Sequence, residues 1–222
     1  MIELNGINLD PRLLKRIADG EPVNIASDAL KRVKTSRAVV EKLVAENRVV
    51  YGITTGFGHL CNTRIEKKDL ERLQTNLIRS HATGVGEAFS PEEVRAMIAI
   101  RVNSLLHGVS GVRPQVVQGL IDLLNQGIVP WVPQQGSVGS SGDLAPLSHI
   151  MLVLMGEGEV LTSAGARRPS AEALQEAGLK PLQLQAKEGL ALINGTSVMT
   201  GVLGLAIERA QMLAQASDII SA

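Results

Sequence analysis

The sequence predicts a mostly α-helical fold that carries one or two short β elements. Apolar residues recur at helical spacing over most of the 222 residues, and residues typical of helix starts and ends border these segments. The chain has only one tyrosine, two phenylalanines and one tryptophan. Its core must therefore consist of Leu, Val, Ile, Ala and Met, which favours closely packed helices. The length allows one large domain or two small ones.

The first two predicted helices begin at serines. Ser27 is expected to cap a helix over residues 27–47, in which aliphatic residues recur at helical spacing. A second helix is expected after Ser90, because Pro91 suits the first helical position and Glu93 can reach back to the serine as in a capping box. The apolar residues that follow lie on one broad face of that helix.

Three shorter elements follow along the chain. Residues 114–125 predict a helix that ends just before a glycine. Ser170 starts a short helix that Gly178 can terminate. Between these two helices, residues 158–168 predict a small β hairpin with a glycine in its turn.

The C-terminal pattern predicts a long, largely apolar helix from about Ser197 to Ala222. The chain stops there while the helix is still apolar, which favours either a truncated chain or an interface with another chain. Residues 189–207 carry no charge and are long enough to cross a bilayer, but Asn194 and Thr200 place polar groups inside that stretch. We therefore expect a segment buried in protein and no membrane partner.

The composition argues against several classes of function. The 22 basic and 22 acidic residues cancel, so no basic surface for nucleic acid is expected. The single cysteine, Cys61, excludes an internal disulfide and fits a reducing compartment. The first residues contain no apolar signal core, so the expected localisation is cytoplasmic. His107 and His149 have no ligand-type spacing with an acid or a cysteine, so no metal site is expected.

Residues 136–149 form the most informative motif, Gly-Ser-Val-Gly-Ser-Ser-Gly-Asp-Leu-Ala-Pro-Leu-Ser-His. One interpretation is structural: Ser141 or Asp143 caps a helix over residues 144–155, and the glycines allow the bend. A phosphate cradle at the same helix start fails on context, because no Lys-Ser/Thr pair follows the bend and no β run precedes it.

The same motif resembles the signature of the aromatic amino acid ammonia-lyases, most of all their histidine-specific members. In that family an Ala-Ser-Gly tripeptide cyclises with loss of two waters into 4-methylidene-imidazole-5-one (MIO), an electrophile. The resemblance implies that Ser140, Ser141 and Gly142 form this cofactor here. It also implies that Asp143 assists the movement of protons.

The chemistry of ring closure can be followed on these residues. Gly142 has no Cβ, so its nitrogen can approach the carbonyl of residue 140 closely. Ser141 supplies the hydroxyl whose elimination leaves the exocyclic alkene. Ser140 stands where the family usually has alanine, but the ring uses only its backbone carbonyl. Closure is therefore expected, and whether the extra hydroxyl crowds the bend stays open.

Three further matches to the family occur, at residues 51–58, at Ser80-His81 and at Asn194. Residues 51–58, Tyr-Gly-Ile-Thr-Thr-Gly-Phe-Gly, match a pattern that makes Tyr51 the general base for the β-proton of the substrate. That role needs cationic or hydrogen-bond-donating groups around the phenol. Ser80-His81 matches the pair that recognises the side chain of the substrate, and an imidazole partner suits an imidazole substrate. Asn194 matches the asparagine beside the cofactor and the substrate carboxylate.

The resemblance covers essentially the whole chain and implies the N-terminal domain of the fumarase/aspartase-like helical fold. Residues 1–196 would form a cofactor-bearing helical domain, and residues 197–222 would begin a truncated helix of a central bundle. Family members are more than twice as long and build each active site from several subunits of a homotetramer, so this chain alone is expected to be inactive.

The implied reaction is the elimination of ammonia from L-histidine to give trans-urocanate. A tyrosine- or phenylalanine-specific lyase, an aminomutase and a catalytically silent fragment stay open as alternatives.

Overall fold

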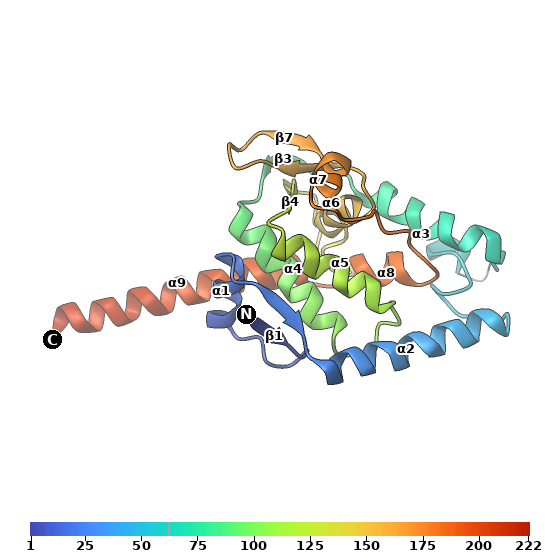
Figure 1. Cartoon of the computed structure of the whole chain (residues 1–222), viewed down its shortest axis with the longest axis horizontal. Coiled ribbons are helices and arrows are strands. Elements are labelled where there is room, and N and C mark those ends of the chain that lie inside the picture. The colour runs from blue at the N-terminus through green and yellow to red at the C-terminus, as the bar shows by residue number, and fades with distance from the viewer. Residues whose placement is uncertain (62) are drawn as a thin grey trace.

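The computed structural model describes residues 1–61 and 63–222, and it confirms the mostly helical fold class (Figure 1). A short 3-10 turn, η1 (Gly58–Leu60), lies between α2 and α3. The helices are α1 (Pro11–Ala18), α2 (Ser27–Ala45), α3 (Lys67–His81), α4 (Pro91–Leu105), α5 (Pro114–Asn125), α6 (Leu144–Leu154), α7 (Ser170–Glu176), α8 (Glu188–Ile193) and α9 (Ser197–Ser221).

The strands are short, and there are more of them than the one or two expected. They are β1 (Ile2–Leu4), β2 (Val23–Ile25), β3 (Val85–Ala88), β4 (Val129–Pro130), β5 (Pro133–Gln135), β6 (Glu159–Leu161) and β7 (Arg167–Pro169). β1 pairs with β2 in parallel, β3 pairs with β5 antiparallel, and β4, β6 and β7 form an antiparallel sheet. Strands of this length are too short to show an alternating pattern in the sequence.

The hairpin that the sequence predicts is confirmed as β6 and β7, which pair antiparallel. Gly165 lies in the connection between them with a φ of +77°, a left-handed conformation that glycine adopts without strain.

The start of α4 follows its sequence signal, and the start of α2 does not. The Ser90 hydroxyl accepts from the amide of Glu93 at 3.3 Å, and the Glu93 carboxylate accepts from the amide of Ser90 at 2.8 Å, which confirms the capping box. The expectation that Ser27 caps α2 is wrong, because Ala26 occupies the cap position. The amide of Ala26 donates to the carbonyl of Leu4 at 2.9 Å, which holds Ala26 extended beside β1. The helix therefore begins directly at Ser27.

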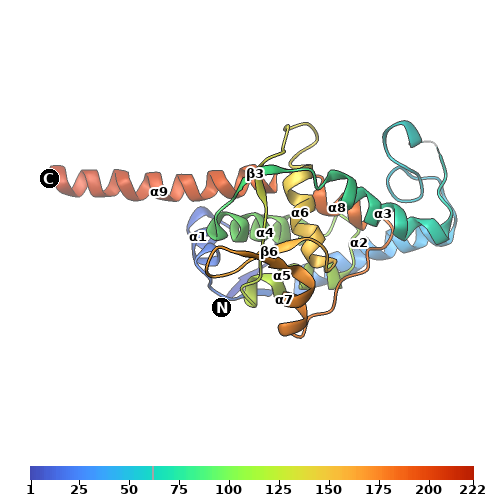
Figure 2. The same ribbon diagram turned by 90° about the horizontal axis from the view of Figure 1, so that it is seen from above.

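α4 lies at the centre of the molecule (Figures 1 and 2). Its buried residues lie on all sides of the helix, as expected for a helix surrounded by other elements. The first half of α9 packs against α4 and α1. Gly201 on α9 allows this close approach, since a Cβ there would lie only 3.0 Å from the amide nitrogen of Met97 on α4.

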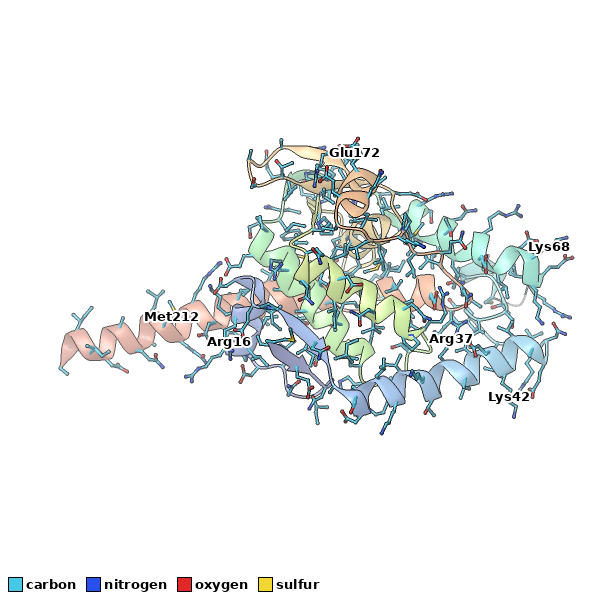
Figure 3. The ribbon with its side chains drawn as sticks, viewed as in Figure 1. Arg16, Arg37, Lys42, Lys68, Glu172 and Met212 are labelled. Atoms are coloured by element: carbon cyan, nitrogen blue, oxygen red, sulfur yellow. The ribbon has the colours of Figure 1, made fainter. Side chains whose placement is uncertain are left out.

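The second half of α9 projects away from the body of the molecule (Figures 1 and 2). Met212 lies on this projecting part (Figure 3), and Leu213 and Ile220 are 72% and 85% exposed. Charged side chains such as Arg16, Lys42 and Lys68 lie on the outer surface of the other elements (Figure 3).

One segment of the described chain, Glu188–Ser221, is long and apolar enough to span a membrane by length and composition alone. Residues 194–196 interrupt the helix within this segment, and the first turns of α9 are buried against α4. The core helix of a protein without a membrane span passes the same test, so the finding is weak support for a span.

Candidate active site

The Ser-Ser-Gly motif lies in an exposed loop that connects β5 to α6. The expectation that no β run precedes it is wrong, because β5 ends at Gln135, although the missing Lys-Ser/Thr pair still excludes a P-loop. Gly139, Ser141 and Gly142 have φ values of +68°, +62° and +100°. Ser141 is thus a serine held in the left-handed region, which is rare outside glycine and marks a bend imposed by its surroundings.

The end of this bend rests on the backbone that links α8 to α9. A Cβ at Gly142 would overlap the backbone of Gly195, so only glycine fits this position. The amide of Asp143 donates to the Gly195 carbonyl at 2.7 Å. The structure therefore brings the Ser-Ser-Gly motif together with Gly195 and its neighbour Asn194, although these residues are about fifty positions apart in the chain.

Asp143 is fully buried and caps a different helix from the one it precedes. Its Oδ2 accepts from the amides of Val198 and Met199 at 2.9 and 3.0 Å, in the first turn of α9. Its Oδ1 accepts from the Ser137 hydroxyl at 3.0 Å. The structural interpretation of this motif, in which Asp143 or Ser141 caps α6, is wrong: Asp143 occupies the cap position of α6 but makes no side-chain bond there.

Ser80 and His81 form the last turn of α3. Nδ1 of His81 lies 2.8 Å from the carbonyl of Leu77, to which it donates, and the Ser80 hydroxyl donates to the same carbonyl at 3.0 Å. In the neutral ring this arrangement leaves Nε2 of His81 as a hydrogen-bond acceptor. His81 is partly buried and Ser80 is exposed, so this end of α3 is open to a ligand.

The segment after His81 meets the start of the Ser-Ser-Gly loop. The amide of Gly84 donates to Nε2 of His149 at 3.1 Å, and a Cβ at Gly136 would lie 3.0 Å from Cα of Gly84. The ring of Trp131 packs edge-on against that of His149, with 5.8 Å between the centroids. Burial lowers the pKa of His149, which favours the neutral ring that can accept this bond.

Asn194 and Gly195 sit on a buried arginine that the sequence analysis missed. Arg101 on α4 donates from Nη2 to the carbonyls of Ala191 and Asn194. A Cβ at Gly195 would overlap Nη1 of Arg101. Burial lowers the pKa of Arg101 to about 10, so the side chain is still charged at neutral pH. Its position four residues after Met97, on a buried side of α4, is the signal that could have identified it.

Tyr51 is not enclosed by the described part of the chain. Its side chain is 55% exposed, and its ring meets that of Phe57 edge-on with 6.3 Å between the centroids. The loop that carries it packs against α8, because a Cβ at Gly52 would lie 2.7 Å from the side chain of Leu190. Among the residues that the structure describes, no hydrogen-bond donor is found on the Tyr51 hydroxyl, so the groups that a basic phenol needs would have to come from elsewhere.

Arg113 forms an ion pair with a buried carboxylate at the start of α8. Its guanidinium binds both carboxylate oxygens of Glu188 at 2.8 Å, and Glu188 is fully buried at the start of α8. Arg37 on α2 lies 3.6 Å from the same carboxylate. These ion pairs anchor α8, whose C-terminal end carries Asn194.

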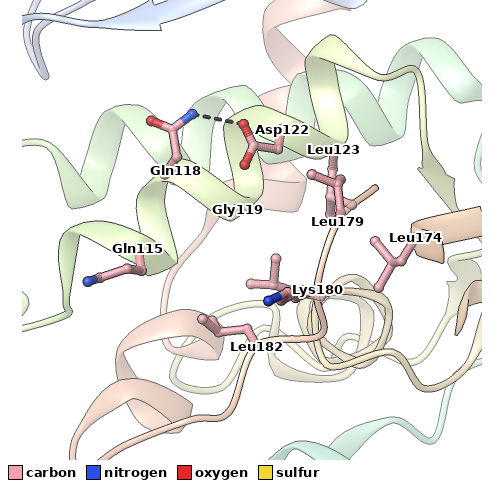
Figure 4. Close-up of a pocket in the computed structure, with 10 residues that line it drawn as sticks. Gln115, Gln118, Gly119, Asp122, Leu123, Leu174, Leu179, Lys180 and Leu182 are labelled. Atoms are coloured by element: carbon pink, nitrogen blue, oxygen red, sulfur yellow. Dashed lines mark hydrogen bonds between the residues drawn. The ribbon is translucent and has the colours of Figure 1, made fainter. Parts of the chain in front are cut away.

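A cavity of about 260 Å³ lies apart from these residues (Figure 4). Its walls come from α5, α6, α7 and the segment that precedes α8, and half of the lining residues are leucines. Gln118 donates to Asp122 at 2.8 Å at its edge. None of the lining residues belongs to a motif of the predicted site.

Comparisons with known proteins agree with the resemblance. The family model for aromatic amino acid lyase matches residues 9–222. The chain is 52% identical to the histidine ammonia-lyase of Geobacillus thermodenitrificans, over all of this chain and 44% of that protein. It therefore spans less than half the length of the curated relatives it matches.

Solved structures share the fold. Histidine ammonia-lyase from Trypanosoma cruzi aligns with a TM-score of 0.91 and 42% identity, over 98% of this chain and 42% of that one. Tyrosine aminomutase from Streptomyces globisporus aligns with a TM-score of 0.92 and 41% identity, over 99% of this chain and 41% of that one. With a family model that matches nearly its whole length, the chain belongs to the aromatic amino acid lyase family.

Proposed function

We propose that this chain is the N-terminal, cofactor-bearing part of a histidine ammonia-lyase, which converts L-histidine to trans-urocanate and ammonia. The observation that carries the proposal is the bend at Ser141 and Gly142, held against Gly195 in a sequence 52% identical to a histidine ammonia-lyase. In this proposal residues 1–196 are the cofactor-bearing domain, and residues 197–222 begin a helix of a central bundle.

The residues of the bend fit MIO. Gly142 lies where no Cβ is tolerated, and Ser141 is already in a left-handed turn. The side chain of Ser140 belongs to the exposed part of the loop, so its extra hydroxyl can remain in solvent. When formed, MIO would supply an electrophile at this loop. The amino group of the substrate is a nucleophile and suits such a group.

The atoms of the bend account for both waters that are lost when the ring closes. The nitrogen of Gly142 bonds to the carbonyl carbon of Ser140. The oxygen of that carbonyl takes up the amide hydrogens of Ser141 and Gly142 and leaves as the first water. The former carbonyl carbon of Ser140 is then joined to the nitrogen of Ser141 by a C=N double bond. Ser141 then loses its hydroxyl and its Cα hydrogen as a second water. Asp143 is proposed to assist these proton movements.

The remaining side chains are proposed to bind the substrate and move its proton. Nε2 of His81 accepts from the imidazole of L-histidine, with Ser80 beside it, and the carboxamide of Asn194 binds the substrate carboxylate. The phenolic oxygen of Tyr51 receives the β-proton. Because Tyr51 is more than half exposed here, we propose that further chain segments or subunits of a homotetramer enclose it, and that this chain alone is inactive.

Intact mass tests the cofactor directly. The chain should be lighter than its sequence by two waters, and the deficit should disappear in Ser141→Ala. Ser163→Ala serves as the control, because it also removes an exposed loop hydroxyl, in the turn between β6 and β7, and leaves the tripeptide and Asp143 unchanged. A wild-type chain of full mass would refute cofactor formation in this chain.

The substrate is tested in a chimera in which the remaining part of the Geobacillus relative follows residue 222. His81→Leu should reduce urocanate formation, followed by its absorbance, by about a hundredfold, because the loss of a substrate hydrogen bond in a buried site is large. Unchanged turnover of L-histidine would contradict the role of His81.

A tyrosine- or phenylalanine-specific lyase or an aminomutase is the second candidate. The likeness to tyrosine aminomutase at 41% identity favours keeping it. Release of ammonia from L-tyrosine or L-phenylalanine by the chimera, without release from L-histidine, would establish the lyase alternative. Conversion of either substrate to its β-amino acid would establish the aminomutase. A chimera inactive on every substrate would instead favour the silent fragment.

A further inference from the structure

Two buried arginines on α4 bind the carbonyl ends of other helices. Arg95 donates to the carbonyls of Ile17 at 2.9 Å and Leu124 at 2.8 Å, at the ends of α1 and α5. Arg101 donates to the carbonyls of Ala191 and Asn194 at the end of α8. The last carbonyls of a helix lack partners and carry the negative end of its dipole, so a guanidinium there is favourable.

Arg101 differs from Arg95 in what lies on top of it. Gly195 contacts Nη1 of Arg101 so closely that a Cβ would overlap it, and Gly142 contacts Gly195 in the same way. The three residues therefore form a stack, with the guanidinium at the bottom and the Ser-Ser-Gly bend at the top. Arg101 is 4% exposed, so its surroundings leave it little freedom to move.

The same side of α4 also fixes the start of α9. Met97 lies one turn before Arg101 on α4, and Gly201 of α9 packs on its backbone. The link between α8 and α9 is thus held on α4 at two points. Asp143 is bonded to this link at two places: its amide donates to Gly195, and its carboxylate accepts from Val198 at the start of α9. A shift of Gly195 would therefore displace the bend through both contacts.

We propose that Arg101 is a positioning residue for ring closure. By holding the carbonyls of Ala191 and Asn194, it fixes Gly195 as the floor against which Gly142 turns toward residue 140. The inference rests on the proposed function, since it concerns the cyclisation described above. A lysine cannot replace it, because an ammonium is a compact point charge that lacks the planar fork of the guanidinium.

The test compares Arg101→Lys with Arg95→Lys, which removes the equivalent buried fork on the same helix, away from the bend. Both variants keep the charge, and circular dichroism confirms that each is folded. Hydrogen exchange reads the amide of Asp143, which donates to Gly195, and the amide of Gly20, which donates to Ile17 at 3.1 Å. Intact mass reads the fraction of chains that have lost two waters.

Arg101→Lys should speed exchange at Asp143 by about tenfold, the worth of one charge-assisted hydrogen bond. It should also reduce the cyclised fraction severalfold. Arg95→Lys should speed exchange at Gly20 and leave both Asp143 and the cyclised fraction unchanged. Gly195→Ala should reproduce the effect of Arg101→Lys at Asp143, because the added methyl overlaps the guanidinium; it replaces Arg101→Lys in the comparison if the lysine variant does not fold.

Unchanged exchange at Asp143 in the Arg101 and Gly195 variants would overturn the inference, and so would a full cyclised fraction in Arg101→Lys. A wild-type chain without the two-water deficit would refute the proposed cofactor instead. The exchange at Asp143 then decides by itself whether Arg101 positions the bend.

Discussion

Replacing Asp143 by alanine should destabilise the chain mainly through α9, although Asp143 directly precedes α6. The carboxylate is fully buried and accepts from the amides of Val198 and Met199 in the first turn of α9. In the alanine variant both amides lose their acceptor, and the Ser137 hydroxyl loses its partner as well. The perturbation therefore combines the loss of a helix cap with buried polar groups left unpaired.

The magnitude follows from these contacts. Loss of a cap costs about 1 kcal/mol, and an unsatisfied buried amide costs about 1–3 kcal/mol. Taken together, the free energy of unfolding should fall by about 3 kcal/mol. For a chain of this size that corresponds to a melting temperature lower by about 6–12 °C. Asp143→Asn retains one oxygen that can accept from α9, so its loss should be closer to about 1 kcal/mol.

Urea denaturation followed by circular dichroism measures both variants against wild type. Asp28→Ala is the matched control, because Asp28 lies in the first turn of α2 but is exposed and binds only Arg32 there among the side chains described. It should change stability far less than Asp143→Ala does, because an ion pair between exposed side chains contributes little. A loss below about 0.5 kcal/mol in Asp143→Ala would refute the reasoning, since no cap or buried amide would then depend on this carboxylate.

Two further predictions concern Gly142 and His149. Gly142→Ala should abolish the two-water deficit and lower the free energy of unfolding by more than about 2 kcal/mol, because the added Cβ overlaps Gly195. Gly165→Ala is the control, since Gly165 also has a positive φ, +77°, but has open space around it. In urea denaturation it should cost only about 1 kcal/mol. For His149 the folded pKa lies below the usual 6.5, so its neutral ring contributes stability above pH 6.5 that is lost as the pH falls through the folded pKa. The stability difference between wild type and His149→Gln should therefore shrink from about pH 7.5 to about pH 5, and a difference independent of pH would contradict the lowered pKa of this buried ring.

Local signals in the sequence predicted several elements correctly. The Ser-Pro-Glu-Glu start of α4, the glycine after α7 and the glycine turn between β6 and β7 act through neighbouring residues, so the sequence shows them directly. The start of α2 was predicted wrongly for the opposite reason. Ala26 is held by Leu4, which is distant in the chain, and no local pattern reports such a contact.

The sequence by itself determined the helical class, the Ser-Ser-Gly motif and the family resemblance, because residue types and spacing carry these features. Only the tertiary structure decided how the bend is supported. Gly142 rests on Gly195, Gly195 rests on Arg101, and Asp143 caps α9 instead of α6. These contacts join residues far apart in the chain, and burial sets their strength: inside the protein a carboxylate or guanidinium must find partners wherever packing places them.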